Sequence, residues 1–258
     1  SDAAWESNYG DDVARMIMPI LFKNLMGDQD EEEMAILNKI LDFHLRTTGQ
    51  DGLRRGRFEV EEINEDNIAF IQSEEDRTTS AHYNAYYHAS LLLGYQLFGD
   101  KRYLEYGQKG LDKLLKMYPN TKREQSQTQE EARLILPVSI ALWVSKDEKY
   151  ERYLETIVAD MKKRLHKTGS YLEWDEGYQA SMRHTKGDGE CSLLSRNGDT
   201  VVDLLYTNNW LPFAFAMAYI ATGNKAYLDD LESTVSFLTS IQMRSDLKEL
   251  DGAWARGF

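Results

Sequence analysis

The sequence is poor in cysteine and proline, and it contains no long apolar run. Its 258 residues include one cysteine, Cys191, and four prolines. A single thiol excludes an internal disulfide framework, and no apolar run approaches the roughly 20 residues of a membrane-spanning helix. Glycine-rich nucleotide motifs and a Walker lysine motif are missing, and the five histidines show no metal-ligand spacing. We therefore expect no cofactor, no metal and no membrane span.

Basic residues are also in deficit, at 30 Lys and Arg against 43 Asp and Glu. The resulting net charge of −13 argues against a nucleic-acid partner, because phosphate backbones are bound by cationic surfaces. A hydrophobic fraction of 42% is too high for a disordered chain and sufficient for a buried core. We expect one folded domain over residues 1–258, with an unusual supply of aromatic side chains, including 15 Tyr and five Trp.

Segments with helical periodicity occupy most of the chain, and candidate strands are confined to 57–63 and 171–174. The predicted helices span residues 11–26, 31–47, 79–98, 101–118, 126–145, 147–167, 201–222 and 225–243. They alternate between two kinds. Helices that are apolar nearly all round, such as 134–144, are expected inside, with aromatics such as Trp143, Phe213 and Phe215 in the core. Helices with one charged stripe, such as 150–165, are expected outside.

Two internal repeats support a series of helical hairpins. Short polar links followed by Tyr recur as GDKRYL, SKDEKY and GNKAYL, and the pattern of acid, Ala, Arg, three apolar residues and Pro occurs at 12–19 and 130–137. Repeated helical hairpins are typical of solenoids and closed toroids. The sequence therefore predicts an all-α fold, an (α/α) toroid with about four hairpins. The long links, 48–78, 119–125 and 168–200, all fall at one end of such an array, where we expect the functional site.

Polar and aromatic side chains collect at that end. The candidate catalytic carboxylates stand near the N-termini of the inner helices and are Asp12, Glu130, Glu131 and Asp203. Amides, arginines and aromatic rings around them are typical of a carbohydrate site, because rings stack on sugars while amides and carboxylates bind adjacent hydroxyls. The candidate substrate-binding residues are Arg15, His82, Tyr83, Tyr86, Arg133, Trp174, Tyr206, Asn208, Asn209 and Trp210. For Asp12 with Arg15 and for Glu130 with Arg133, an ion pair on one helical face is the competing interpretation. The loop 173–176 adds three further acids, Glu173, Asp175 and Glu176.

Four motifs carry a resemblance to a known superfamily: HYNAY (82–86), EEARLILP (130–137), NGDTVVDLLYTNN (197–209) and RSDLKELDGAWARGF (244–258). They resemble the all-α region of large bacterial proteins in the six-hairpin glycosidase superfamily. The resemblance implies an (α/α) toroid, a carbohydrate substrate in glycan degradation and a periplasmic or secreted location. Relatives continue into further helices, so it also implies an incomplete six-hairpin ring, a fragment of a longer protein with possible further domains.

Glycoside hydrolysis is our leading hypothesis for the function. It requires a protonated carboxyl at the glycosidic oxygen and a carboxylate that activates water or attacks C1. The sequence does not rank the four candidate carboxylates as acid or base. A non-catalytic glycan-binding or scaffolding toroid is the second hypothesis, because one fold hosts unrelated functions. A sugar epimerase or isomerase is the third, and it would need a pair of histidines at the cavity.

Overall fold

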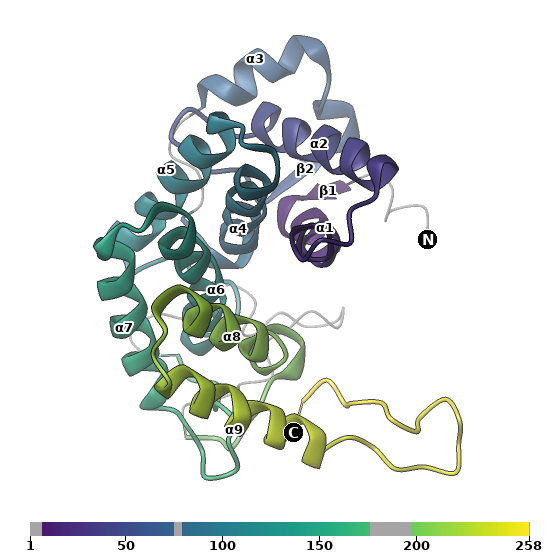
Figure 1. Ribbon diagram of the computed structural model, residues 1–258, viewed down its shortest axis with the longest axis vertical. Coiled ribbons are helices and arrows are strands. Elements are labelled where there is room, and N and C mark those ends of the chain that lie inside the picture. The colour runs from purple at the N-terminus through teal and green to yellow at the C-terminus, as the bar shows by residue number, and fades with distance from the viewer. Residues whose placement is uncertain (1–6, 75–78, 176–197, 258) are drawn as a thin grey trace. The chain divides into compact units, whose positions relative to one another are not determined.

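The computed structural model describes residues 7–74, 79–175 and 198–257 (Figure 1). The helices are α1 (Gly10–Leu25), α2 (Glu31–Arg46), α3 (Glu65–Ser73), α4 (Ala81–Phe98), α5 (Lys101–Met117), α6 (Gln127–Ser145), α7 (Glu148–Lys162), α8 (Leu211–Thr222) and α9 (Ala226–Ser240). Shorter elements are β1 (Ser7–Tyr9), β2 (Arg57–Glu59), the 3₁₀ turn η2 (Val60–Glu62) and the π-helical turn η3 (Leu204–Asn208). Cys191 and Glu176 lie outside the described residues.

The prediction of an all-α fold is confirmed, and the described helices follow the expected order of hairpins. Short links join α1 to α2, α4 to α5, α6 to α7 and α8 to α9 (Figure 1). Gly99 and Gly223 end α4 and α8 in the left-handed conformation, with φ of 71° at both positions. Such a residue ends a helix abruptly, and glycine adopts it at little cost.

One predicted helix, 201–222, is wrong as a single element. The Asp203 side chain accepts a hydrogen bond from the Tyr206 amide at 2.8 Å and begins η3, and Pro212 stands in the first turn of a separate helix, α8. Proline has no amide hydrogen and suits a helix start, so the segment divides there. The predicted helix 147–167 is also too long, since α7 ends at Lys162. Helix α3 was missed, because it lies within the polar link 48–78.

The chain forms two compact units, which we describe separately. The first comprises residues 1–122 and 140–147, and the second comprises 123–139 and 148–258. In the first unit α4 packs against both α1 and α5, and β1 pairs antiparallel with β2. Residues 84–94 of α4 are all buried, as expected for a helix with no polar face.

A buried arginine joins the elements of the first unit. Arg54 is almost wholly buried; its Nε donates to Thr47 Oγ1 at 3.0 Å and its Nη2 donates to Asn8 Oδ1. Its guanidinium also lies 4.7 Å from the centroid of the Phe58 ring. Burial lowers the pKa of Arg54 to about 10, which leaves it charged at neutral pH. A buried cation needs such partners, because an uncompensated one is strongly destabilising.

The second unit contains α7, α8, α9 and the first part of α6. Helix α8 packs against α9, and Val202, Leu204 and Phe237 form a small buried apolar cluster. Phe215 is fully buried, as predicted, whereas Phe213 is 48% exposed, so its prediction as a core residue is wrong. Helix α8 therefore keeps one apolar side open among the described residues, and a helix with no polar face need not be covered on every side.

Two buried histidines in the first unit should make its stability depend on pH. His44 and His88 are wholly buried, and burial is the main reason that the pKa of each is lowered to about 3. Among the described residues, His44 Nε2 and both ring nitrogens of His88 make no hydrogen bond. Each imidazole therefore stays neutral in the folded protein.

We predict that the free energy of unfolding falls as the pH drops below about 6.5. Above that pH the imidazoles are neutral in both states; below it only the unfolded chain takes up the protons, down to the folded pKa of about 3. The loss is about 1.4 kcal/mol per histidine for each pH unit. Urea unfolding of the wild type and of His88→Gln at several pH values measures it. The variant should lose about half of this slope; an unchanged slope would contradict the prediction.

Candidate functional site

Asp12, the carboxylate predicted at the start of α1, and its neighbour Asp11 both contact Arg15. The Asp12 side chain is 56% exposed and forms an ion pair with Arg15 Nη2. Asp11, which the sequence analysis did not single out, is the buried member of the pair, and its Oδ2 lies 3.1 Å from the same nitrogen. The interpretation of Asp12 and Arg15 as an ion pair on one helical face describes this geometry.

The candidate residues on α4 lie at different depths. His82 is buried against the edge of Tyr83, with ring centroids 4.7 Å apart, and Tyr83 stacks on Tyr9 at 6.5 Å. Tyr86 is wholly buried, so packing is the role that its position supports. Only Tyr83 of these three is partly exposed to solvent.

In the second unit an extended segment, Tyr171–Asp175, places three side chains inside and two outside. Tyr171, Glu173 and Asp175 are buried, whereas Leu172 and Trp174 are half-buried. This alternation is that of a strand, in which successive side chains point to opposite sides. Backbone hydrogen bonds fix the segment at both ends: the Gln127 amide donates to the Trp174 carbonyl at 2.8 Å, and the Leu172 amide donates to the Arg164 carbonyl at 3.0 Å.

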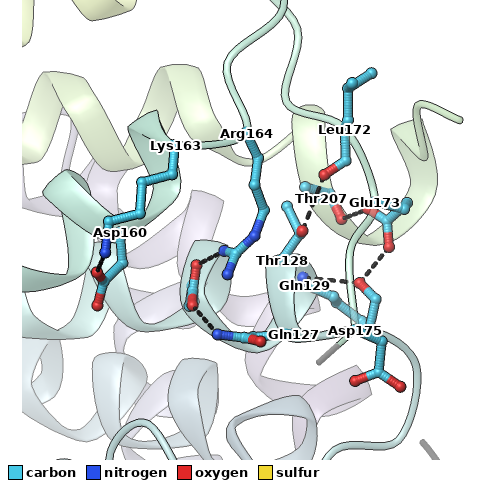
Figure 2. Close-up of polar contacts among 12 residues, drawn as sticks. Gln127, Thr128, Gln129, Asp160, Lys163, Arg164, Leu172, Glu173, Asp175 and Thr207 are labelled. Atoms are coloured by element: carbon cyan, nitrogen blue, oxygen red, sulfur yellow. Dashed lines mark hydrogen bonds and ion pairs between the residues drawn. The ribbon is translucent and has the colours of Figure 1, made fainter. Parts of the chain in front are cut away.

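Glu173 is the central buried acid of this unit. Thr207 Oγ1 donates to its Oε1 at 2.6 Å and Ser126 Oγ donates to its Oε2, so two hydroxyl groups hold the carboxyl (Figure 2). Burial and, after it, the nearby charge of Asp203 raise the pKa of Glu173 to about 7. The hydroxyl groups favour the charged form but do not outweigh the burial. Glu173 therefore retains a proton close to neutral pH.

Asp203 is the second member of this carboxyl pair. It is buried at the start of η3, where it accepts from the Tyr206 amide at 2.8 Å, and burial raises its pKa as well. Backbone donors and the cations Arg256 and Arg133 act in the opposite direction. Burial thus favours the neutral form of Asp203 as it does that of Glu173, and the charge of Asp203 adds to the shift of Glu173.

Other buried acids of this unit are ion-paired instead. Glu131 pairs with Arg164 Nη1 and accepts from Gln127 Nε2 at 2.8 Å (Figure 2), and Asp175 pairs with Arg123. Burial raises the pKa of Glu131, and the Arg164 guanidinium acts against this shift. Glu131 and Glu173 thus lie in one network around the first turn of α6 but in different electrostatic settings.

Some candidate aromatic and amide residues of the second unit pack or form hydrogen bonds inside the protein, and others line a cavity. Asn208 is wholly buried and bonds both the amide and the carbonyl of Tyr171, so its role is structural. Tyr206 is buried beneath two cations, with its ring centroid 5.4 Å from the Arg133 guanidinium carbon and 5.7 Å from that of Arg256. Glu130 is buried in the first turn of α6, and Trp210 immediately precedes α8.

Two cavities open beside this network. The larger, the Trp254 cavity, has a volume of about 520 Å³ and is lined by Leu204, Leu205, Asn209, Leu238, Trp254, Ala255 and Arg256. The smaller, the Trp174 cavity, has a volume of about 330 Å³ and is lined by Lys163, Arg164, Leu165, His166, Leu172 and Trp174. Both fall in the size range of small-molecule sites, and both lie where outer helices end and inner helices begin. Asn209 and Trp174 are the two predicted binding residues that line them.

Glu173 is the residue that sequence reasoning did not rank. The loop 173–176 was noted for its acids, but no spacing rule connects Glu173 to Ser126 and Thr207, which are 47 and 34 residues away. The one available signal was the alternation of apolar and acidic residues over 171–175. Among the described residues no group of three or more His, Cys, Asp or Glu side chains is arranged to hold a metal ion. No described helix has the length and apolar character to cross a membrane.

We predict that the burial of Glu173 lowers stability as the pH rises. Its folded pKa of about 7 exceeds the ordinary value of 4.5, so the stabilising proton is present below about pH 4.5 and is lost through pH 7. Glu173→Gln keeps the shape of the side chain and removes its charge. The stability of this variant relative to the wild type should therefore be higher at pH 8 than at pH 5. Thermal unfolding at both pH values, with the exposed Glu155→Gln as control, measures this. The same change of melting temperature between pH 5 and pH 8 in Glu173→Gln and Glu155→Gln would refute the prediction.

Comparison with known proteins shows similarity in structure and not in sequence. No protein-family model and no curated protein matches the chain. A sugar epimerase from a ruminal bacterium superposes with a TM-score of 0.65 at 13% identity, over 98% of this chain and 64% of that one. D-mannose isomerase gives 0.62 at 12%, over 98% and 63%. An inactive variant of the α-1,6-mannanase GH76A of Salegentibacter sp. HEL1_6, in complex with α-1,6-mannotetrose, gives 0.54 at 13%, over 93% and 62%.

The chain thus spans less than two thirds of the length of each of these structures. At such low identities the similarity establishes the fold alone. The fold that these three structures share with the chain is the all-α, (α/α)-toroid class that the sequence predicts.

Proposed function

We propose that this chain is part of a protein that cleaves glycosidic bonds by carboxyl acid/base catalysis. The observation that carries the proposal is the buried carboxyl of Glu173, whose pKa is raised to about 7 by burial and, after it, by the nearby charge of Asp203. A general acid must hold its proton at the working pH, and a buried carboxyl pair is a common way to achieve this. The α-1,6-mannanase with the same fold supports a glycan as the substrate class.

Within the pair we assign contact with the substrate to Asp203. It directly precedes Leu204 and Leu205, which line the Trp254 cavity. Asp203 would deliver the shared proton to the glycosidic oxygen. Glu173 would be a positioning residue that keeps the proton on the pair near neutral pH.

Hydrolysis also needs a carboxylate that activates water or attacks C1, and Glu131 is our candidate. Its ion pair with Arg164 favours the charged form, and Arg164 lines the Trp174 cavity. The surroundings of the two sites differ, because Glu173 beside Asp203 has hydroxyl groups as partners, whereas Glu131 has a guanidinium. This difference assigns the acidic role to Asp203 and the basic role to Glu131.

Asp203→Asn and Glu131→Gln should each lower kcat/KM by roughly 10²- to 10⁴-fold, the usual contribution of a general acid or base. Release of reducing ends from a panel of neutral and acidic oligosaccharides, including α-1,6-mannooligosaccharides, measures this. The exposed Glu155→Gln should leave the rate unchanged. Full activity of both Asp203→Asn and Glu131→Gln on a cleaved substrate would exclude the assignment.

Glu173→Gln tests the positioning role separately. Wild-type activity should fall as the pH rises through about 7, when the pair loses its proton. Without Glu173 the remaining Asp203 loses its proton earlier, so the alkaline side of the pH profile should move to lower pH. A variant that merely damages the fold would lower the rate at all pH values and leave the profile in place.

Sugar epimerisation or isomerisation is the second candidate, because the epimerase and isomerase structures superpose with TM-scores of 0.65 and 0.62. Incubation of free aldoses with the chain in D₂O separates the two functions. Epimerisation or isomerisation next to the carbonyl incorporates solvent deuterium into the sugar without cleaving a glycosidic bond. Glycan binding with neither reaction would favour the non-catalytic hypothesis.

A further inference from the structure

The strongest basic run of this acidic chain borders the Trp174 cavity. Residues 162–167 read KKRLHK, in a protein whose net charge is −13. Lys163, Arg164 and His166 of this run line the cavity, together with Leu165, Leu172 and Trp174. Basic residues at the end of α7 suit the helix dipole, but only the last turn of a helix benefits, and the run continues five residues beyond Lys162.

The walls of the Trp174 cavity are held in place by a tight turn. His166 donates its amide to the Ser170 carbonyl at 2.8 Å, and Leu172 donates to the Arg164 carbonyl at 3.0 Å, so 163–166 and 172–174 are the two arms of one hairpin. Gly169 makes the turn with φ of 90°, and a Cβ there would lie 2.6 Å from the Ser233 carbonyl oxygen. A rigid hairpin presents both arms to a ligand without a cost of ordering them.

Most cations of the run 162–167 form ion pairs. Lys162 Nζ lies 2.8 Å from Asp230. Lys163 Nζ lies 2.6 Å from Asp160, and Arg164 pairs with Glu131 (Figure 2). Lys167 forms no ion pair within the described part of the chain. The two cations that line the cavity, Lys163 and Arg164, thus each have one acid as a partner. The His166 imidazole adds a further polar group, 2.9 Å from Thr168 Oγ1 through its Nδ1.

Arg164 has donors left over. Among the described residues its side chain makes one hydrogen bond, from Nη1 to Glu131 Oε2. The neighbouring Lys163 side chain is 72% exposed. A guanidinium presents five N–H groups in a fixed plane that matches the oxygens of a carboxylate or a sulfate. The half-buried Trp174 indole and the two leucines supply an apolar wall, which an inorganic anion would not use.

We propose that the Trp174 cavity binds an acidic sugar residue, one that carries a carboxylate or a sulfate ester. The sugar ring stacks on the Trp174 indole, and its anionic group accepts hydrogen bonds from Arg164 and Lys163. Arg164 then lies between the ligand anion and Glu131 and offsets the repulsion between them. This inference rests on the proposed function, because it names the class of glycan that the chain would process.

Direct binding to the full chain tests this inference. Isothermal titration calorimetry compares a short oligogalacturonate, a sulfated galactan oligosaccharide, a neutral mannooligosaccharide and sodium sulfate. We expect one of the acidic oligosaccharides to bind about tenfold more tightly than the neutral one, with the affinity falling at high salt. The arm that binds identifies the anion as carboxylate or sulfate. Equal affinity for acidic and neutral sugars, equal affinity for sodium sulfate alone, or no binding would overturn the proposal.

Variants locate the binding. Trp174→Ala should lower the affinity for the acidic oligosaccharide by roughly tenfold, and Lys163→Gln should lower it by about threefold. These are the usual contributions of a stacked ring and of an exposed charge. Lys248→Gln, an exposed lysine outside the cavity in the same unit, is the matched control and should bind as the wild type. Wild-type affinity in both Trp174→Ala and Lys163→Gln would place the ligand elsewhere and refute the assignment.

The test separates this inference from the proposed hydrolysis. Tight binding that depends on Trp174, without cleavage by the wild type, would support the cavity assignment and count against hydrolysis. Cleavage of neutral glycans at an equal rate by Trp174→Ala and the wild type would support hydrolysis and count against the cavity assignment.

Discussion

The second unit depends on one extended segment, Tyr171–Asp175, whose backbone bonds to α6 and whose neighbour in space is η3. Its carbonyl and amide groups bond to Gln127, Val201 and Asn208, so three parts of the chain meet along five residues. The strand-like alternation then decides where each side chain goes. Glu173 must point inward because Leu172 and Trp174 line the cavity, and the electrostatics of the site follow from that direction.

Burial acts differently on the acids of this region because their partners differ. A guanidinium compensates the charges of Glu131 and Asp175, whereas Glu173 has hydroxyl groups as partners and a neighbouring carboxyl as its main source of repulsion. Hydroxyl donors recover less of the lost solvation than an opposite charge does. Burial therefore raises the pKa of both Glu173 and Glu131, but for Glu131 the Arg164 guanidinium acts against the shift.

The first unit uses compensation of another kind. Arg54 keeps its charge through polar partners and the Phe58 ring, while His44 and His88 avoid charge by remaining neutral. Its candidate residues at the start of α1 are paired with Arg15, and Tyr86 is in the core. Within the described residues, the Trp254 cavity, the Trp174 cavity and the buried acids Glu173 and Asp203 belong to the second unit.

The sequence by itself determined the helical hairpins and the all-α class. Apolar periodicity, the polar links and the glycines after α4 and α8 are local signals, and local hydrogen bonding and burial respond to them. It also indicated the end of the hairpins where Trp174 and Asn209 line cavities. It missed the break between η3 and α8, because a capping side chain and a proline outweighed a continuous apolar pattern. Only the tertiary structure decided that the charge of Asp203 acts on Glu173, since 30 residues separate them and the pKa of each depends on groups brought together by folding.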